Sequence, residues 1–383
     1  MKTALKILHL YRTYFPDPPG GLQEAIRQIC LATAPFGVES RIFTLSPQPD
    51  PPVIERPEGR VARCRSWCSP ASCDMGGLQA FRSFRELSQW ADIIHYHFPW
   101  PFADLLRFVA GSSKPAVMTY HSDIVRQQSL ARLYAPLMRR TLGAMTAVVA
   151  TSPAYARTSP ILNSMVRPEQ LKVIPLGMDD ALTINNQSFD EVAYLKGLGL
   201  DTAVPFVLAI GVLRYYKGFH ILVEAAQRIK GTVVIAGSGP EEGSLKALAA
   251  QYGVTNVIFA GQVSIDEKRT LLRHCHILAL PSHLRSEAFG MVLVEAAMFS
   301  KPLISCEIGT GTSYVNYDQH TGIVIPPESP EALADAANRL LADWRLAESF
   351  GIAARKRYED LFSSESLGSQ YAALYRSVAT CRS

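Results

Sequence analysis

Short apolar runs recur along the chain, and most are followed by a polar or glycine turn and then by a segment with helical spacing. The first run covers residues 5–10, and Leu22, Ile26 and Ile29 mark the helix that follows its turn. This alternation predicts an α/β fold built on doubly wound parallel sheets. The other runs of strand type are residues 41–45, 93–97, 116–119, 148–150, 172–174, 206–210, 232–236, 257–259, 277–280 and 301–305.

The length of 383 residues exceeds a single typical core, so two domains are expected. Residues 180–204 are polar and irregular, which indicates a linker. The predicted domains are residues 1–190 and 200–355, and residues 356–383 form a helical tail. No apolar run reaches the roughly 18 residues that a membrane-spanning helix needs.

Seven scattered cysteines favour a reducing compartment, so a cytoplasmic location is expected. A signal peptide is the rival interpretation of the N-terminus, but His9 ends the short apolar run and no small-residue cleavage site follows. Cys64, Cys68 and Cys73 lack the two-pair spacing of a zinc site, so no metal is predicted there. The surrounding residues 46–90 are rich in Pro, Ser and Arg, and the sequence assigns them no chemical role.

The net positive charge of the protein comes from the first half of the chain. Residues 1–190 carry 20 Lys and Arg against 15 Asp and Glu, and the remainder carries 18 against 19. Such a mildly basic half favours an anionic partner, for example a phospholipid or a lipid diphosphate. No nucleic-acid-binding motif is present, so nucleic acid is not an expected partner.

A basic amphipathic helix is predicted over residues 124–142. Its arginines cover its own sheet in one interpretation, with their apolar stems on the surface. In the other, the helix rests on an anionic membrane, and the sequence leaves both open. The arginines are Arg126, Arg132, Arg139 and Arg140.

The strongest candidate chemistry lies in residues 281–297, between a short strand and an apolar helix that begins after Gly290. A helix start presents free N–H groups and partial positive charge, so phosphate or sugar oxygens bind there readily. Glu287 and Glu295 frame this place, and a carboxylate in so apolar a helix needs a partner. Taken singly, they are better explained as a solvated loop acid and as a helix acid paired with an arginine.

Histidines follow or occupy two of the predicted strands. His121 comes after the strand 116–119, at the carboxyl end where ligands sit in doubly wound sheets. His95 and His97 share one face of the strand 93–97, where two histidines can bind metal, but the sequence shows no third ligand.

Glycines after several predicted strands let the backbone approach a ligand closely. Arg214 and Lys217 lie in one of these glycine loops, and cations between a strand and a helix suit an anion. For the paired Gly20 and Gly21, a plain turn is the other interpretation and, by itself, the better one; the short glycine motif around Gly239 is a weak signal. The glycines are Gly20, Gly21, Gly211 and Gly239.

Glu287 and Glu295 form the pattern Glu-x7-Glu, with Phe289 and Gly290 inside it and Gly-Thr-Gly-Thr following at 309–312. This combination resembles the retaining glycosyltransferases of family 4. The resemblance implies the GT-B architecture, in which two Rossmann-like domains face a central cleft. The first domain would bind the acceptor and the second the nucleotide-sugar donor, and the last helix would cross back to the first domain.

The resemblance also implies roles for the candidate residues. Glu287 would contact the hydroxyls of the donor sugar, and Glu295 would contact the ribose. His121 would lie beside the reacting sugar, and Lys217 would bind the diphosphate with Arg214. The implied catalytic residues are His121, Arg214, Lys217 and Glu287, and the other implied donor contacts are Gly20, Gly21, Gly211, Gly239, Val263, Ala288, Phe289, Gly290, Met291 and Glu295.

One position departs from the family pattern, because Val212 stands where the family has an arginine. Arg214 is expected to supply the missing charge. No Asp-x-Asp occurs in the chain, so the resemblance implies transfer without a metal or another cofactor.

The segment that begins at His121 is similar to mannosyl- and rhamnosyltransferases that build bacterial O-antigen. The expected reaction moves such a hexose, GDP-linked, to a lipid-linked or polysaccharide acceptor, in the cytoplasm or on the inner face of the cytoplasmic membrane. A transferase that uses a UDP-sugar is one alternative. A non-catalytic nucleotide- or glycan-binding relic and a peripheral membrane scaffold are the others.

Overall fold

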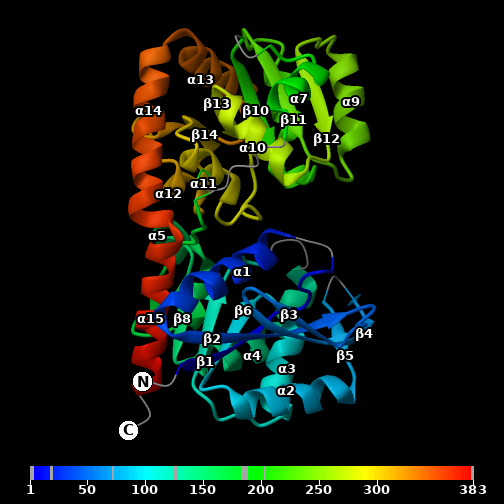
Figure 1. Cartoon of the computed structure of the whole chain (residues 1–383), viewed down its shortest axis with the longest axis vertical. Coiled ribbons are helices and arrows are strands. Elements are labelled where there is room, and N and C mark those ends of the chain that lie inside the picture. The colour runs from blue at the N-terminus through cyan, green and yellow to red at the C-terminus, as the bar shows by residue number, and fades with distance from the viewer. Residues whose placement is uncertain are drawn as a thin grey trace. The chain divides into compact units, whose positions relative to one another are not determined.

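The structure is a computed structural model of the chain, and it describes residues 4–17, 20–70, 73–124, 128–180, 182, 189–201 and 204–380. The chain forms two compact α/β units (Figure 1). Unit 1 consists of Met1–Asp179 and Phe362–Ser383, and unit 2 consists of Asp180–Leu361.

The sheet of unit 1 has the strand order β3-β4-β2-β1-β6-β7-β8-β9 in the described part of the chain, and β5 pairs with β4. All neighbours from β4 to β9 are parallel, whereas β3 and β5 pair antiparallel with β4. Strands β2, β4 and β3 follow one another on the β1 side of the β1–β6 pair, and β7, β8 and β9 follow on the β6 side. The strands are β1 (Leu5–Leu10), β2 (Val38–Ser46), β3 (Val53–Arg56), β4 (Gly59–Cys68), β5 (Met75–Gly76), β6 (Ile93–Phe98), β7 (Ala116–Tyr120), β8 (Ala147–Ala150) and β9 (Leu171–Val173).

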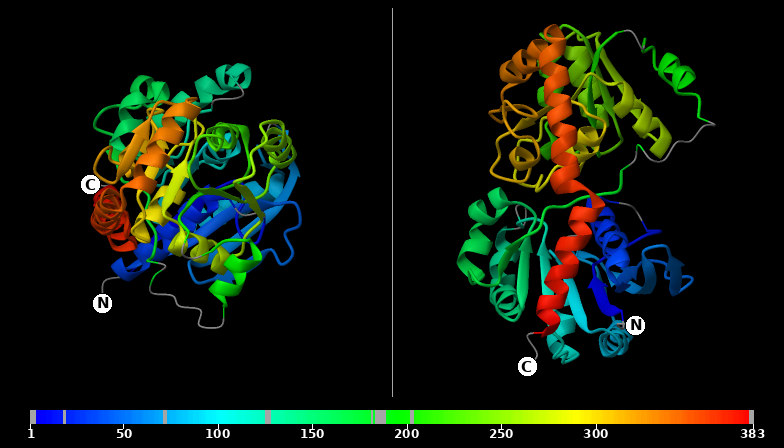
Figure 2. Two further views of the ribbon diagram at one scale, coloured as in Figure 1. Left: turned by 90° about the horizontal axis from the view of Figure 1, so that it is seen from above. Right: turned by 60° about the vertical axis from the view of Figure 1, so that its left-hand side comes forward.

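The last helix, α15, belongs to unit 1 although unit 2 precedes it in the sequence (Figure 2). It packs on α1, and its Tyr371 and Tyr375 join the core formed with β1, β6 and β7. None of the described helices is both long and apolar enough to cross a bilayer. The helices of unit 1 are α1 (Gly21–Thr33), α2 (Leu78–Trp90), α3 (Pro101–Val109), α4 (Gln128–Gly143), α5 (Pro153–Thr158), α6 (Pro160–Met165) and α15 (Ser364–Thr380), with the 3₁₀ turn Ala34–Phe36.

Unit 2 is built on an all-parallel sheet with the order β12-β11-β10-β13-β14-β15. Its strands are β10 (Phe206–Ile210), β11 (Thr232–Ala236), β12 (Val257–Gly261), β13 (Ile277–Leu280), β14 (Leu303–Cys306) and β15 (Gly322–Ile325). Its helices are α7 (Glu191–Gly197), α8 (Phe219–Ala225), α9 (Glu242–Gln251), α10 (Ile265–His274), α11 (Met291–Met298), α12 (Thr312–Val315), α13 (Pro330–Ala342) and α14 (Trp344–Arg357). A 3₁₀ turn lies at Tyr215–Lys217, and a π-helical turn covers Tyr358–Phe362.

The segment predicted as a linker differs from the prediction. The described residues of this segment, 180, 182, 189–201 and 204, fall in unit 2, and residues 191–197 form α7. Glu191 of α7 pairs with Arg273, and a second oxygen of its carboxylate lies 3.0 Å from Nε2 of His274, both on α10. These contacts hold a polar segment against its neighbour, which the polarity of the segment could not reveal.

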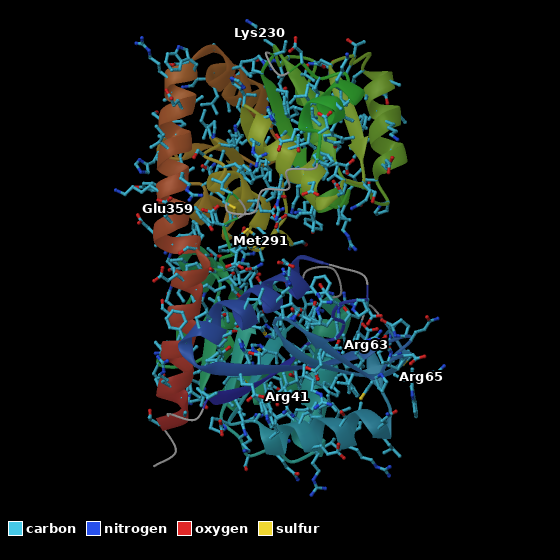
Figure 3. The ribbon with its side chains drawn as sticks, viewed as in Figure 1. Arg41, Arg63, Arg65, Lys230, Met291 and Glu359 are labelled. Carbon is cyan, nitrogen blue, oxygen red and sulfur yellow. The ribbon has the colours of Figure 1, made fainter. Side chains whose placement is uncertain are left out.

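Residues 46–90 contain β3, β4, β5 and α2, so the stretch to which the sequence assigned no chemical role is a sheet edge and its covering helix. Arg63 of β4 is buried, and its Nη2 lies 3.3 Å from a carboxylate oxygen of Asp17 in the loop after β1. Arg65, two residues further along the same strand, is exposed (Figure 3). Arg63 therefore anchors the loop that follows the first strand.

Candidate functional site

The strand order of unit 2 reverses between β10 and β13, which are neighbours in the middle of its sheet. The chain continues from β10 to β11 and β12 on one side, and from β13 to β14 and β15 on the other. In doubly wound sheets, ligands bind outside the carboxyl ends of the strands at such a reversal. The loops 211–218 and 281–290 follow these two strands, so they form the candidate site.

The two loops touch through their backbones at Gly218. This glycine has φ +71°, and a Cβ atom on it would lie 2.0 Å from the carbonyl oxygen of Pro281. Only glycine satisfies both conditions, because other residues are strained at this φ and would clash. The N–H of His283 donates to the carbonyl oxygen of Tyr216 (3.1 Å), which fixes the second loop beside the first.

Lys217 and Glu287 form an ion pair across these loops, and their side chains are 14% and 11% exposed. The hydroxyl of Ser282 also donates to Glu287 (3.3 Å). Burial by itself lowers the pKa of Lys217, but the attraction of Glu287, with Tyr216 and Glu295 adding to it, raises that pKa above its ordinary value. Lys217 is therefore a largely buried ammonium group that is charged at physiological pH.

The backbone between Glu287 and α11 is held by the loop after β14. The N–H of Gly311 donates to the carbonyl oxygen of Ala288 (2.8 Å), and a Cβ atom on Gly311 would lie 2.6 Å from the ring of Phe289. Gly290 has φ +85° and precedes Met291, the first residue of α11 (Figure 3). The glycines of both loops thus allow close packing and give α11 an abrupt start.

Glu295 of α11 has a partner, as expected for a carboxylate in an apolar helix. The partner is a lysine rather than an arginine, because Nζ of Lys268 on α10 lies 2.8 Å from its carboxylate. Val263 is half-buried in the loop between β12 and α10. The Lys268–Glu295 pair therefore joins α11 to α10, the helix that follows this loop.

The glycine loop after β11 packs on the loop after β10. A Cβ atom on Gly237 would lie 2.0 Å from the carbonyl oxygen of Gly211, and one on Gly239 would lie 2.5 Å from that of Leu213. Close approach of protein backbone is thus sufficient to explain Gly239 without a ligand. Arg214 is exposed in the same region, and no ion pair or side-chain hydrogen bond joins it to a described residue.

The remaining predicted residues lie in unit 1. Gly21 is the first residue of α1, and Gly20 precedes it with an extended backbone, φ −156°. His121 follows β7, and its Nε2 lies 3.0 Å from Nδ1 of His97. Burial lowers the pKa of His121 to about 3, so this imidazole is neutral at physiological pH. Arg126 falls outside the described residues.

Sequence reasoning missed several partners because they come from distant segments. Lys268 and His97 are examples, since each touches a predicted residue that lies on another helix or after another strand. Ser282 was missed although it lies in the same loop as Glu287. A third histidine beside His95 and His97 was also missed, and it is His9. These three are the one group of three or more potential metal ligands found among the described residues, and the three cysteines of residues 64–73 form no such group.

Comparison with known proteins places the chain in a family. Residues 193–357 match the family described as glycosyl transferases group 1, and residues 20–177 match a glycosyl transferase 4-like domain. The chain is 42% identical to the D-rhamnosyltransferase WbpZ of Pseudomonas aeruginosa, over 94% of this chain and 93% of that protein. It is 38% identical to the O-antigen chain mannosyltransferase C of Escherichia coli, over 99% and 100%.

Among solved structures, sucrose-phosphate synthase from Thermosynechococcus elongatus aligns with 98% of this chain and 100% of its own, with a TM-score of 0.79 and 24% identity. This likeness concerns the fold, and it confirms the predicted arrangement of two parallel-sheet α/β domains. The identities to the two bacterial transferases cover nearly the whole chain and confirm the predicted family. The chain is therefore a member of the group 1 glycosyltransferases and has the GT-B fold.

Proposed function

We propose that this glycosyltransferase moves a hexose of the mannose or rhamnose type from a GDP-linked donor to a lipid-linked or polysaccharide acceptor of a cell-surface glycan, with retention at the anomeric carbon. The Lys217–Glu287 pair at the reversal of the unit 2 sheet carries this proposal. It offers a fixed cation to a phosphate and a carboxylate to sugar hydroxyls. The names of the two relatives support the class of sugar.

In the proposed reaction, the bond between the anomeric carbon and the diphosphate breaks while the acceptor oxygen bonds to the same face. The acceptor proton passes to the leaving phosphate oxygen. Negative charge grows on the diphosphate, where Lys217, Arg214 and the N–H groups at the start of α11 would stabilise it. His121 would position or polarise the reacting groups, and Gly20 and Gly21 would be further donor contacts.

The proposed chemistry needs no metal, since fixed protein charge neutralises the leaving group. We expect full transfer activity after treatment with excess EDTA and gel filtration. Activity that disappears with EDTA and returns with Mg²⁺ or Mn²⁺ would show that a divalent ion, rather than Lys217 and Arg214, balances the diphosphate.

The base and sugar are tested by thermal-shift measurements with GDP, UDP, ADP and their common sugars. A ligand that binds only the folded state raises the unfolding midpoint, and at 100 times its Kd it adds about 2.7 kcal/mol. We expect the largest shift with GDP-mannose or GDP-rhamnose, followed by turnover. A response to UDP-sugars alone would favour the alternative donor, and binding without any turnover would favour a relic.

The acceptor side of the proposal includes the inner surface of the cytoplasmic membrane. Helix α4 buries Met138 but exposes Arg132, Arg139 and Arg140, and Leu133 is 80% exposed. A basic face with an exposed apolar residue suits anionic lipid headgroups. Such a surface would hold the enzyme beside a lipid-linked acceptor.

Cosedimentation with vesicles tests this surface. Replacing Arg132, Arg139 and Arg140 by alanine should reduce binding to vesicles that contain anionic lipid. The control replaces the exposed cations Arg228, Lys246 and Arg345 of unit 2, which removes the same charge elsewhere. Equal losses in both variants would indicate a dependence on net charge alone.

A further inference from the structure

The histidines of unit 1 meet in its core, at the carboxyl ends of β1, β6 and β7. His9 on β1 is the register partner of His95 on β6, and His97 lies two residues further on the same face. His121 follows β7, the next strand of the sheet. His9 and His95 are 0% exposed, His97 is 2% exposed and His121 is 5% exposed.

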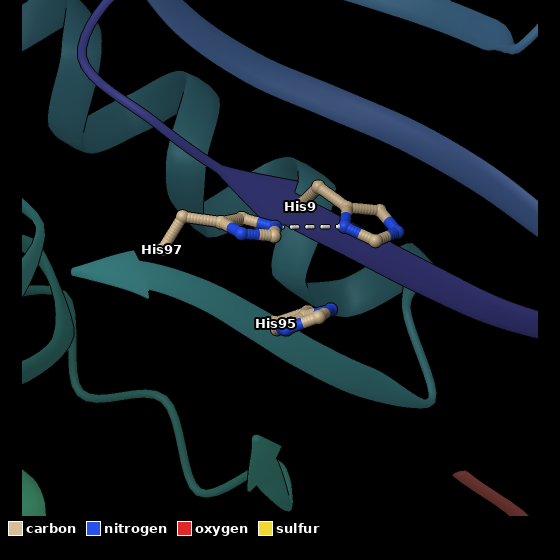
Figure 4. Close-up of side chains that lie close together, drawn as sticks. All are labelled: His9, His95 and His97. Carbon is tan, nitrogen blue, oxygen red and sulfur yellow. Dashed lines mark hydrogen bonds between the residues drawn. The ribbon is translucent and has the colours of Figure 1, made fainter. Parts of the chain in front are cut away.

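Three of these histidines form a hydrogen-bonded chain that ends at His121 (Figure 4 shows its first bond). Nδ1 of His9 lies 3.1 Å from Nε2 of His97, and Nδ1 of His97 lies 3.0 Å from Nε2 of His121. Nε2 of His9 is buried without a partner. Among the described residues, no hydrogen bond reaches Nδ1 of His121.

His95 belongs to the cluster but not to this chain. Its Nδ1 lies 2.7 Å from the hydroxyl of Tyr375 on α15, and its Nε2 lies 2.7 Å from the hydroxyl of Thr119. Both ring nitrogens are therefore used away from His121. His95 therefore provides a control, since it lies in the same core as the hydrogen-bonded histidines but is not bonded to them.

A metal ion does not account for the cluster, although the ligand atoms of His9, His95 and His97 lie within 4.8 Å of one another. All four ring nitrogens of His95 and His97 already have hydrogen-bond partners. No carboxylate or thiolate joins the group in the described part of the chain. A divalent ion would be an uncompensated charge in the core.

The hydrogen-bonded histidines are neutral imidazoles. Burial lowers the pKa of His9 to about 3, and burial together with the neighbouring histidines lowers that of His97 well below its ordinary value. A neutral imidazole has one N–H and one lone pair. Each hydrogen bond needs one N–H donor and one lone pair, so the N–H groups of His9, His97 and His121 must all point in the same direction.

We propose that His9 and His97 are positioning residues that hold His121 in the tautomer with its proton on Nδ1. The direction follows from His9. If the chain ran the other way, Nε2 of His9 would carry a buried N–H without an acceptor, an arrangement that folded proteins rarely keep. In the proposed direction that nitrogen holds only a lone pair. His9 then donates to His97, and His97 donates to His121.

This tautomer makes Nδ1 of His121 a hydrogen-bond donor, so it would polarise a substrate oxygen and would not accept a proton at that nitrogen. The inference rests on the proposed function, in which His121 lies beside the reacting sugar. Two different measurements distinguish a failure of the inference from a failure of the proposed function. The tautomer is observed without any substrate, whereas the role of His121 is tested by the activity of His121→Ala.

The experiment is ¹⁵N NMR of the ligand-free protein labelled at histidine, with the His121 signals assigned by their loss in His121→Ala. We expect a protonated Nδ1 and a bare Nε2 on His121 of the native protein. His97→Phe removes the donor, so His121 should show a mixture of tautomers. His97→Asn places an amide N–H near the former Nδ1 and should restore the native pattern in part.

Activity supplies the second readout. His97→Phe should lower kcat at least about tenfold with donor KM changed less than about twofold, since removing one positioned hydrogen-bond donor costs roughly 10²–10³-fold in kcat. Tyr375→Phe breaks the bond to His95 in the same core, and it should leave both the His121 tautomer and kcat unchanged. An equal loss of kcat in Tyr375→Phe would show that the loss in His97→Phe comes from weaker packing of the core rather than from the His121 tautomer.

Two results would overturn the inference. One is a native His121 with its proton on Nε2, which needs no variant to be folded. The other is a stoichiometric metal ion in the purified protein that is lost in His9→Ala. Normal turnover by His121→Ala would instead remove His121 from the proposed function, whatever its tautomer.

Discussion

Lys217 and Glu287 lie 70 residues apart in the sequence, yet they form one largely buried ion pair between the loops that follow β10 and β13. Each charge compensates the other, because either one alone would be an unpaired charge with little access to water. The pair also fixes the relative position of the loops after β10 and β13. The site therefore depends on this contact both for its charge balance and for its shape.

We predict that Lys217→Ala and Glu287→Ala each lower kcat/KM for the donor at least about tenfold, a loss of roughly 1.4 kcal/mol in the transition state. The double variant should lose less than the sum of the single losses, because the two side chains interact directly. Steady-state kinetics with the donor found by the thermal-shift screen measures all three values.

The matched control is Lys246→Ala. Lys246 also forms an ion pair with a glutamate, Glu242, but its side chain is 53% exposed and lies on the surface of α9. Surface pairs contribute about 0–1 kcal/mol, so activity and stability should stay near native. Near-native turnover in Lys217→Ala and Glu287→Ala would remove this pair from the active site.

Arg214 is predicted to replace the arginine that the family carries at position 212. Arg214→Ala should raise the donor KM several-fold, since it removes a cation from the proposed diphosphate site. Val212 is 50% exposed, so it can accept a longer side chain, and Val212→Arg in the Arg214→Ala background should recover part of the loss. Failure of Arg214→Ala to affect either kcat or KM would leave Lys217 as the sole side-chain cation.

Substitutions of Glu287 and Glu295 should differ in their effect on the affinity for the nucleotide alone. Glu295→Gln should weaken binding of both the nucleotide and the nucleotide sugar, about tenfold if one hydrogen bond to a charged group of roughly 1.5 kcal/mol is lost. Glu287→Gln should weaken the nucleotide sugar more than the nucleotide, because its proposed contacts are sugar hydroxyls and its contact with Lys217 affects both ligands. Isothermal titration calorimetry with both ligands distinguishes these patterns, and equal effects of both changes on the nucleotide would contradict the assignment.

The buried histidines predict that stability falls in mild acid. The pKa of His9 and of His121 is lowered by burial to about 3, and burial also lowers those of His95 and His97. Above pH 6.5 both folded and unfolded states are neutral at these sites. Below it the unfolded state takes up protons that the folded state refuses, so each histidine costs about 1.4 kcal/mol at pH 5.5.

Urea unfolding at pH 7.5, 6.5 and 5.5 measures this slope. Replacing His9 by glutamine should remove one histidine's share of the pH dependence, in addition to any constant loss of stability. The same free energy of unfolding at pH 7.5 and 5.5 would show that the histidines are not neutral and buried as described.

Much of the fold could be predicted from local pattern. The apolar runs at 206–210 and 277–280 correspond to β10 and β13 at those bounds. The run at 41–45 lies within β2, whose ends extend to Val38 and Ser46. Strands β3 to β5 were missed because none of them is a continuous apolar run: β4 alternates arginine with small residues, and β3 and β5 are short.

The sequence by itself determined which residue types were available near the strand ends: Lys217 before a glycine, Glu287 before an apolar helix, and histidines on or just after predicted strands. These follow from spacing along the chain. Tertiary structure alone decided that Lys217 pairs with Glu287, that Lys268 pairs with Glu295, and that His9 reaches His121 through His97. These residues lie on loops, helices and strands that are far apart in the sequence, and only the order of the strands in each sheet brings those elements together.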